Sequence, residues 1–265
     1  MSMHRNINRR FALFTILMLI LVTPACGEAT PEASSTPEPT ATLEPTEGPE
    51  PQYKILFIGS SLTYYNRGLK YHFTQLVGAA DPQLVIQADA VTRSGAPLEH
   101  MWEQTDARER IGEGNYDVVV LQDAIPNTDV DTFHEYVRLF VEEIRDAGAE
   151  PVLFLTWARM GHTTDEIAQA HGDIAMELGV DVAPVGLAWQ RAMEERPELD
   201  LYMPDDIHPS IHGTYLTVNV IYAAVFGEIP IGLDYLPSDM GGVTEAEAAF
   251  LQRIAWETVQ EYQTQ

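Results

Sequence analysis

KILFIGSSLT, residues Lys54–Thr63, joins an almost unbroken apolar run to a glycine and two serines. An apolar run without alternating polar residues is typical of a strand buried on both faces of a parallel sheet. Gly59 permits a tight turn at the end of that strand. We therefore expect Ser61 to lie at the carboxyl edge of the sheet, where parallel α/β sheets bind their ligands. A serine in this place more often caps a helix, so alone it does not identify a nucleophile.

Further apolar runs of the same kind follow along the chain, and helical patterns lie between them. These runs are Leu84–Ala90, Asp117–Gln122, Pro151–Thr156 and Val180–Pro184. Strands that alternate with helices imply right-handed crossovers and a parallel sheet covered on both faces. The sequence predicts an α/β fold, a three-layer α/β/α sandwich with a flavodoxin-like, mainly five-stranded parallel sheet.

Three helix starts can be predicted from local signals. Thr163 with Glu166, and Thr244 with Glu247, have the spacing of a capping box ahead of helical apolar patterns. Pro209 is expected at the first position of another helix, where its missing N–H costs nothing.

The overall composition excludes several kinds of partner and site. The chain has 265 residues, with 15 Lys+Arg against 40 Asp+Glu, and a net charge of −25. This acidity argues against nucleic acid and anionic membrane surfaces as partners, because both require clustered Lys and Arg. A single cysteine excludes an internal disulfide and a site with several cysteine ligands for a metal.

The first 26 residues have the pattern of an export signal. Arginines precede the apolar run Phe11–Val22, which is too short to span a bilayer comfortably. Ala25 and Cys26 follow it and resemble the end of a bacterial lipobox, in which the cysteine is lipidated. An ordinary cleavage site beside an incidental cysteine is the alternative. We expect an exported protein, held by a lipid at Cys26 on the extracytoplasmic face of a bacterial membrane, with no other membrane contact.

A linker and one domain follow the signal. Residues 27–52 consist mainly of Pro, Thr, Ala, Ser and Glu, a composition that cannot offset the entropy lost on folding. Residues 53–265 have the length of a single domain.

The second chemical signal is Asp205-Asp206-Ile207-His208, near the other end of the domain. A serine hydroxyl is a weak nucleophile until a base takes its proton, and that base needs a carboxylate to fix its tautomer. A D-x-x-H turn can place the carboxylate of Asp205 beside the imidazole of His208.

These blocks together resemble the SGNH (GDSL-type) hydrolase family, and the match covers essentially all of 53–265. The resemblance implies that Ser61 is the nucleophile, His208 the general base and Asp205 its orienting partner. It also implies an oxyanion hole formed by the N–H groups of Ser61 and Gly95 and by the amide of Gln122, with no metal or cofactor.

Two residues depart from the family pattern. Ser60 stands where the first block has Asp, at a position that does no chemistry. Gln122 stands where the family has Asn, and it carries the same amide donors one methylene further out. The hole could therefore persist with altered geometry, whereas the alternative for Gln122 is a polar residue that merely ends a strand.

The function expected from this resemblance is hydrolysis of a carboxylic ester through an acyl-enzyme. The expected substrate is a small molecule or a carbohydrate, with a short acyl group such as a sugar O-acetyl. Two alternatives stay open: a non-catalytic glycan-binding module on the same fold, and an acyltransferase. Candidate pocket residues are Tyr64 and Asn66, with Tyr65 between them, and Trp157, although an aromatic at any of these positions could equally pack in the core. His208 and His212 have the i, i+4 spacing of a zinc clasp, a less favoured interpretation.

Overall fold

The computed structural model describes residues 50–124, 128–238 and 242–264. The chain divides into two units, Met1–Thr46 and Glu47–Gln265. The predicted export signal, Cys26 and nearly all of the predicted linker lie outside the described residues. Within the described part, none of the helices has the length and apolar character needed to cross a membrane.

Five parallel strands form the central sheet, in the order β2-β1-β3-β4-β5. Their bounds are β1 Tyr53–Gly59, β2 Ile86–Thr92, β3 Val118–Leu121, β4 Glu150–Phe154 and β5 Asp181–Ala183. This is the flavodoxin-like order, so the predicted fold class is confirmed. The second strand begins two residues later than the apolar run suggested.

The apolar run of β1 is divided between two cores. Ile55 and Phe57 lie in one hydrophobic cluster, whereas Leu56 and Ile58 lie in the other. Successive side chains of a strand point to opposite faces, so a strand covered on both sides needs an apolar residue at every position. This is why the sequence shows a continuous run instead of alternation.

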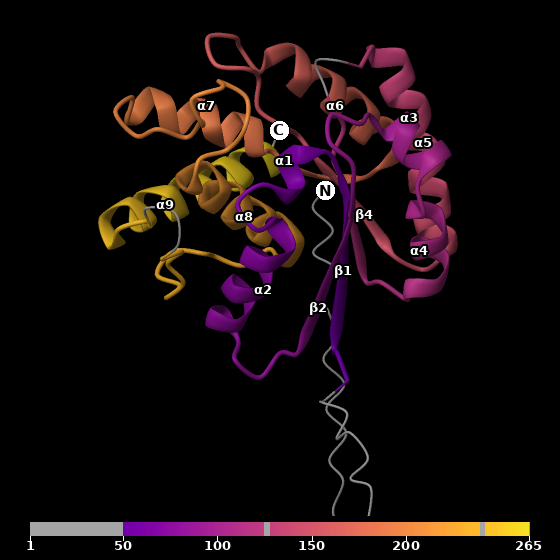
Figure 1. Cartoon of the computed structure of the whole chain (residues 1–265), viewed down its shortest axis with the longest axis horizontal. Coiled ribbons are helices and arrows are strands. Elements are labelled where there is room, and N and C mark those ends of the chain that lie inside the picture. Colours follow the sequence, from indigo (N-terminus) through magenta and orange to yellow (C-terminus); the bar gives the residue numbers. More distant parts are fainter. Residues whose placement is uncertain (1–49, 125–127, 239–241, 265) are drawn as a thin grey trace, which may run out of the picture. The chain divides into compact units, whose positions relative to one another are not determined.

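Helices cover both faces of the sheet (Figure 1). One face carries α2 Leu69–Ala80, α7 Val185–Glu195, α8 Ile211–Phe226 and α9 Glu245–Gln263. The other carries α3 Leu98–Gln104, α4 Ala107–Gly114, α5 Val130–Asp146 and α6 Asp165–Leu178. A short helix, α1 Ser61–Tyr64, lies directly after β1.

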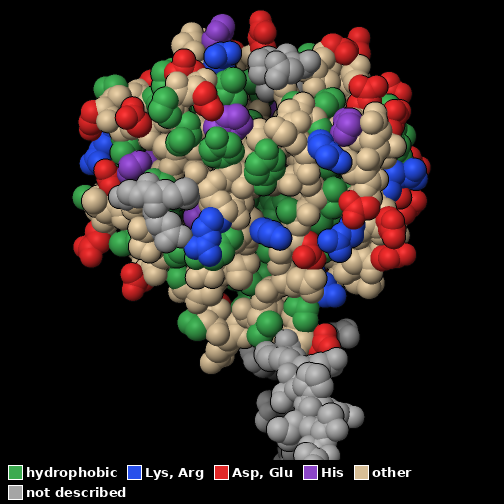
Figure 2. Space-filling view, in the orientation of Figure 1, with side chains coloured by type: hydrophobic (Ala, Val, Ile, Leu, Met, Phe, Trp, Pro, Cys, Tyr) green, Lys and Arg blue, Asp and Glu red, His purple; other side chains and the backbone are tan. Residues whose placement is uncertain are grey.

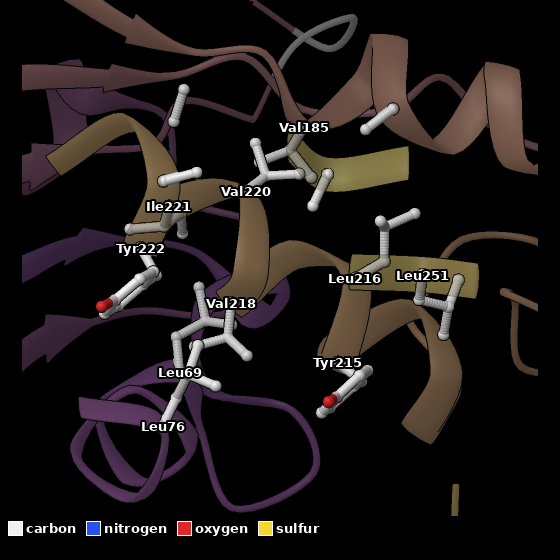
Figure 3. Packing of buried hydrophobic residues seen from close by; sticks show 14 of the residues in the cluster. Leu69, Leu76, Val185, Tyr215, Leu216, Val218, Val220, Ile221, Tyr222 and Leu251 are labelled. Carbon is white, nitrogen blue, oxygen red and sulfur yellow. The ribbon is translucent and has the colours of Figure 1, made fainter. Parts of the chain in front are cut away.

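Helix α8 is the most deeply buried of these helices. Its residues from Ile211 to Ala223 are almost all inaccessible, and it packs against α2, α7 and α9. Figure 3 shows Val218 beside Leu69 and Leu76 of α2, and Leu216 beside Leu251 of α9. A helix that is apolar on every side belongs inside the protein, so α8 anchors the loop that precedes it.

The predicted helix starts meet with different outcomes. The capping box of Thr244 and Glu247 is confirmed at the start of α9. The capping box predicted at Thr163 is wrong, because the N-cap of α6 is Thr164 and its side chain makes no capping hydrogen bond. The prediction for Pro209 is also wrong: this residue forms an extended bridge with Tyr202, and Ser210 caps α8 instead.

The segment between α8 and α9 is hydrogen-bonded to the buried Gln252 side chain of α9. Gln252 accepts the N–H of Gly232 at 2.9 Å and donates to the carbonyl of Leu233 at 3.0 Å. These two bonds satisfy backbone groups that have no ladder or helix partner. The described part of 227–242 is therefore a covering for this side of the domain.

Charged side chains on the surface are partly paired. Acidic side chains lie around the edge of the face in Figure 2, whereas several Lys and Arg side chains lie nearer its middle. Arg138 pairs with Glu177, and Arg191 and Arg253 share Glu195 and Glu257. Exposed pairs of this kind add little stability each, so the domain depends mainly on its two cores.

Burial of His171 in α6 should make stability fall in weak acid. Burial lowers the pKa of this imidazole from 6.5 to about 4. Between these values the unfolded chain binds a proton that the folded chain does not, so the free energy of unfolding falls as pH falls through this window. The loss should approach about 3 kcal/mol. Urea unfolding at pH 7 and pH 4.5 measures it, and His171→Leu should remove this part of the loss. An equal loss in variant and wild type would contradict the assignment to His171.

Candidate active site

Helix α1 directly follows the carboxyl end of β1, at the edge of the sheet (Figure 1). Ser60 is the N-cap of α1, and Ser61 is the first helical residue, with 7% of its surface exposed. A Cβ at Gly59 would lie 2.6 Å from both the amide oxygen of Gln122 and the hydroxyl of Thr63. Only glycine fits at this position, which explains the glycine ahead of the two serines.

Three of the predicted residues come together across 147 positions of sequence. His208 Nε2 lies 3.0 Å from Ser61 Oγ, and His208 Nδ1 lies 2.7 Å from Asp205 Oδ2. An ionised carboxylate can only accept, so Nδ1–H donates to Asp205 and Nε2 is left to accept from the Ser61 hydroxyl. The imidazole is therefore oriented with its basic nitrogen on the serine.

The carboxylate of Asp205 is held in its ionised form. Its Oδ1 accepts the backbone N–H groups of His208 at 2.9 Å and Ile207 at 3.1 Å. The hydrogen bond from the His208 side chain, followed by the one from its backbone, lowers the pKa of Asp205 to about 2. Asp205 thus carries its negative charge throughout the neutral pH range.

The loop around His208 is fixed by backbone contacts from two directions. The N–H of Met203 donates to the carbonyl of His208 at 2.7 Å, and Tyr202 bridges Pro209. On the other side, Trp157 Nε1 donates to the carbonyl of Ile207 at 2.9 Å. His208 therefore lies in a turn that is hydrogen-bonded to neighbouring segments on both sides.

Gln122, at the end of β3, has a fully buried side chain. Its Oε1 accepts three donors of the β1–α1 turn: the N–H of Ser60 at 2.6 Å, the Ser60 hydroxyl at 2.9 Å and the Thr63 hydroxyl at 3.1 Å. Because a backbone N–H can only donate, this atom must be the oxygen. The amide nitrogen points the other way and donates to the carbonyl of Asp123.

Several solved structures resemble this chain in fold. An SGNH hydrolase candidate from Slackia heliotrinireducens matches with 24% identity over 65% of this chain and 98% of that one, at a TM-score of 0.56. A DUF4886 family protein from Bacteroides uniformis matches with 16% identity over 78% of this chain and 95% of that one, at a TM-score of 0.60. The acetylxylan esterase Axe2 from Geobacillus stearothermophilus matches with 18% identity over 66% of this chain and 94% of that one, at a TM-score of 0.56. The chain has the SGNH-hydrolase fold.

Sequence comparison adds nothing to this likeness, since no protein-family model and no curated protein matches the chain. The likeness to SGNH hydrolases is therefore a likeness of fold.

The oxyanion hole predicted for an SGNH site is only partly consistent with this geometry. The N–H of Ser61 lies in the first turn of α1, where a helix N–H has no intrahelical acceptor. Gly95 is exposed, in a turn with φ of +64°, and the N–H of Arg93 ties that turn to the carbonyl of Gly59 at 3.0 Å. The N–H of Ser61 thus belongs to the nucleophile turn itself, and the N–H of Gly95 belongs to a loop that is bonded to the end of β1.

The prediction that the amide N–H of Gln122 completes the hole is wrong for this geometry. The extra methylene lets the amide fold beneath the turn, where its oxygen faces Ser60 and its nitrogen faces Asp123. Gln122 instead joins the nucleophile turn to β3.

Asp123 is a residue at this edge for which the sequence suggested no role. Its Oδ2 accepts the N–H of Leu98 at 2.7 Å, at the start of α3, and burial raises the pKa of its carboxyl. This contact ties the loop of Gly95 to the end of β3. The only signal in the sequence was a polar pair that directly follows a buried strand.

The candidate pocket residues are divided by the structure. Tyr64 is 41% exposed beside the nucleophile, as a substrate-facing residue would be. Asn66 donates to the carbonyl of Pro209 and to the Thr214 hydroxyl, both at 2.8 Å, so its amide serves the fold. Trp157 is 3% exposed and stacks on Trp189 at 3.8 Å and 4°, so the prediction that it lines the pocket is wrong.

The zinc interpretation of His208 and His212 finds no support in their contacts. Both ring nitrogens of His208 are engaged, with Asp205 and Ser61. His212 Nε2 lies 3.3 Å from a carboxylate oxygen of Glu247 in α9. Within the described residues no cluster of three or more potential metal ligands occurs.

Gln122→Ala should mainly destabilise the protein. The substitution removes the acceptor of a buried N–H and two hydroxyls, which should lower the free energy of unfolding by about 3 kcal/mol. Urea unfolding measures this loss, and the exposed Gln169→Ala is the control, expected to change it by less than about 0.5 kcal/mol. Unchanged stability with a fall in kcat of about 10²–10³ would instead return the amide to the oxyanion hole.

Proposed function

We propose that this protein is a serine esterase that hydrolyses carboxylic esters through an acyl-enzyme on Ser61. The observation that carries the proposal is the continuous relay from Ser61 Oγ to His208 Nε2 at 3.0 Å and from His208 Nδ1 to Asp205 at 2.7 Å. The presence of an acetylxylan esterase and SGNH hydrolases among similar folds supports the same reaction class.

In the proposed mechanism, His208 Nε2 takes the proton of Ser61 as the hydroxyl attacks the ester carbonyl. Asp205 holds the ring in the required tautomer and stabilises the imidazolium. The N–H groups of Ser61 and Gly95 face the oxygen of the tetrahedral intermediate. His208 then gives its proton to the departing alcohol, and water, activated by the same base, releases the acyl group.

The proposed substrate class is a short-acyl ester, with an O-acetylated carbohydrate as the first candidate. Two of the similar structures are acetylxylan esterases, and this supports the choice of substrate class. The exposed ring of Tyr64 offers a flat apolar face beside the nucleophile, of the kind on which a sugar can stack.

Ester hydrolysis that depends on Ser61 is the direct test. The purified protein should hydrolyse p-nitrophenyl acetate faster than longer p-nitrophenyl esters and should release acetate from acetylated xylan. Ser61→Ala should lose essentially all turnover, and Asp205→Asn, which spoils the tautomer of His208, should lower kcat by a factor on the order of 10⁴.

A serine-reactive phosphonate provides the second readout. It should label the wild-type protein and leave Ser61→Ala unlabelled. Absence of both turnover and labelling would overturn the esterase, whereas labelling with product formed only when an acceptor alcohol is added would indicate acyl transfer.

We also propose that the protein is exported and anchored through a lipid on Cys26. The support is the charged start, the short apolar run and the placement of the single cysteine directly after a small residue. In a bacterial host, the protein should incorporate labelled fatty acid and sediment with membranes, and Cys26→Ser should do neither. An unlabelled wild-type protein would contradict the anchor.

A further inference from the structure

The ring of Tyr65 lies flat on the imidazole of His208. The two ring centroids are 4.3 Å apart and the planes differ by 15°. Tyr65 directly follows α1, so the segment that carries the nucleophile also supplies a face for the base. This contact uses neither ring nitrogen of His208, both of which point in the plane of the ring toward Ser61 and Asp205.

The backbone after Tyr65 adopts a conformation that needs support. Asn66 has φ of +51° and Arg67 has φ of +73°, and neither is glycine. Two consecutive residues of this kind are disfavoured and persist only where the surroundings impose them. Such strain commonly occurs at functional sites. Here the strained turn follows Tyr65, which contacts the proposed base.

Two sets of contacts impose the conformation. The Asn66 side chain donates to the carbonyl of Pro209, next to His208, and to Thr214 of α8. The Asn66 carbonyl lies 2.6 Å from Nε2 of the buried His72, whose Nδ1 lies 2.7 Å from the Tyr235 hydroxyl. The turn is thus bonded to the base loop itself and to the buried His72, which fixes the backbone directly after Tyr65.

We propose that Tyr65 is a positioning residue for His208 that also stabilises its cationic form. This inference rests on the proposed esterase, in which His208 becomes an imidazolium when it takes the Ser61 proton. The face of an aromatic ring attracts a cation, so the stacking should strengthen as the charge develops. The flat contact also opposes rotation of the imidazole out of the plane that joins Asp205 to Ser61.

This role differs from that of a substrate platform in a measurable way. A residue that supports the base acts on the chemical step, so its loss lowers kcat and leaves KM unchanged. A residue that binds the substrate would chiefly raise KM. No hydrogen bond to the Tyr65 hydroxyl occurs within the described residues, so the ring and not the hydroxyl should be required.

The test compares Tyr65→Leu, Tyr65→Phe and the wild type on p-nitrophenyl acetate. Tyr65→Leu removes the aromatic face and should lower kcat by about 3- to 10-fold with KM unchanged. Tyr65→Phe keeps the face and should stay within about twofold of the wild type. Tyr262→Leu, which removes another half-buried tyrosine ring near α6, is the control and should leave both constants unchanged.

A second series keeps the shape of the ring. Phenylalanines with increasing numbers of fluorine atoms at position 65 weaken the negative face of the ring without removing it. The value of kcat should fall stepwise along this series, with thermal unfolding unchanged. If Tyr65→Leu does not fold, this series alone tests whether the aromatic face at position 65 stabilises the charged His208.

The outcomes separate this inference from the proposed function. A wild-type protein without Ser61-dependent turnover would overturn both. An active wild type whose kcat is matched by Tyr65→Leu, or by the most fluorinated variant, would overturn the role of Tyr65 alone. A rise in KM at constant kcat would make Tyr65 a substrate contact instead.

Discussion

The oxygen of the Gln122 amide accepts three donors from the turn that carries Ser61, and the geometry of the site follows from this attachment. Without it, the Ser60 N–H and two hydroxyls would be buried and unpaired at the end of β1. The amide stands on β3, which pairs with β1 along its length, so the turn inherits the rigidity of two neighbouring strands. Gly59 makes room for the amide, which is why the motif contains a glycine there.

The remaining loops at this edge are attached in the same manner. Asp123 holds the start of α3, and the N–H of Arg93 reaches the carbonyl of Gly59, so the Gly95 turn is tied to β1 and β3. The base approaches from the other side, on a turn supported by Trp157 and by α8. Ser61, Tyr65 and Asn66 of the nucleophile segment contact this base loop at His208 and Pro209. These short connections between rigid elements hold His208 at hydrogen-bonding distance from both Ser61 and Asp205.

The sequence predicted the fold well because β1 and β3 are buried on both faces. Such strands must be apolar throughout, and this pattern is visible without any tertiary information. It also singled out Ser61, His208 and Asp205, because a serine after a buried strand and a D-x-x-H turn are local signals and together they resemble the SGNH family. The directions of side chains were not predictable in this way. Gln122 could point its amide toward the substrate or beneath the turn, and only the positions of Ser60 and Thr63 decide between them.

The errors at Trp157 and Pro209 have a related cause. Trp157 follows a strand at the edge where ligands bind, but its partner Trp189 is distant in sequence and its position depends on the packing of α7. Pro209 suits the first turn of a helix, yet Tyr202 draws it into an extended bridge. In each case a contact with a residue outside the local motif outweighs a local preference.

The stacked indoles of Trp157 and Trp189 give the protein an optical reporter of its own site. Two indole rings in contact at 3.8 Å couple their strong electronic transitions, which contributes to the far-ultraviolet circular dichroism spectrum. Trp157 also donates to the carbonyl of Ile207, the residue before the base, so a shift of that loop would act directly on one of the two rings. A change in this signal when a ligand is added would report movement of the base loop without any label on the protein.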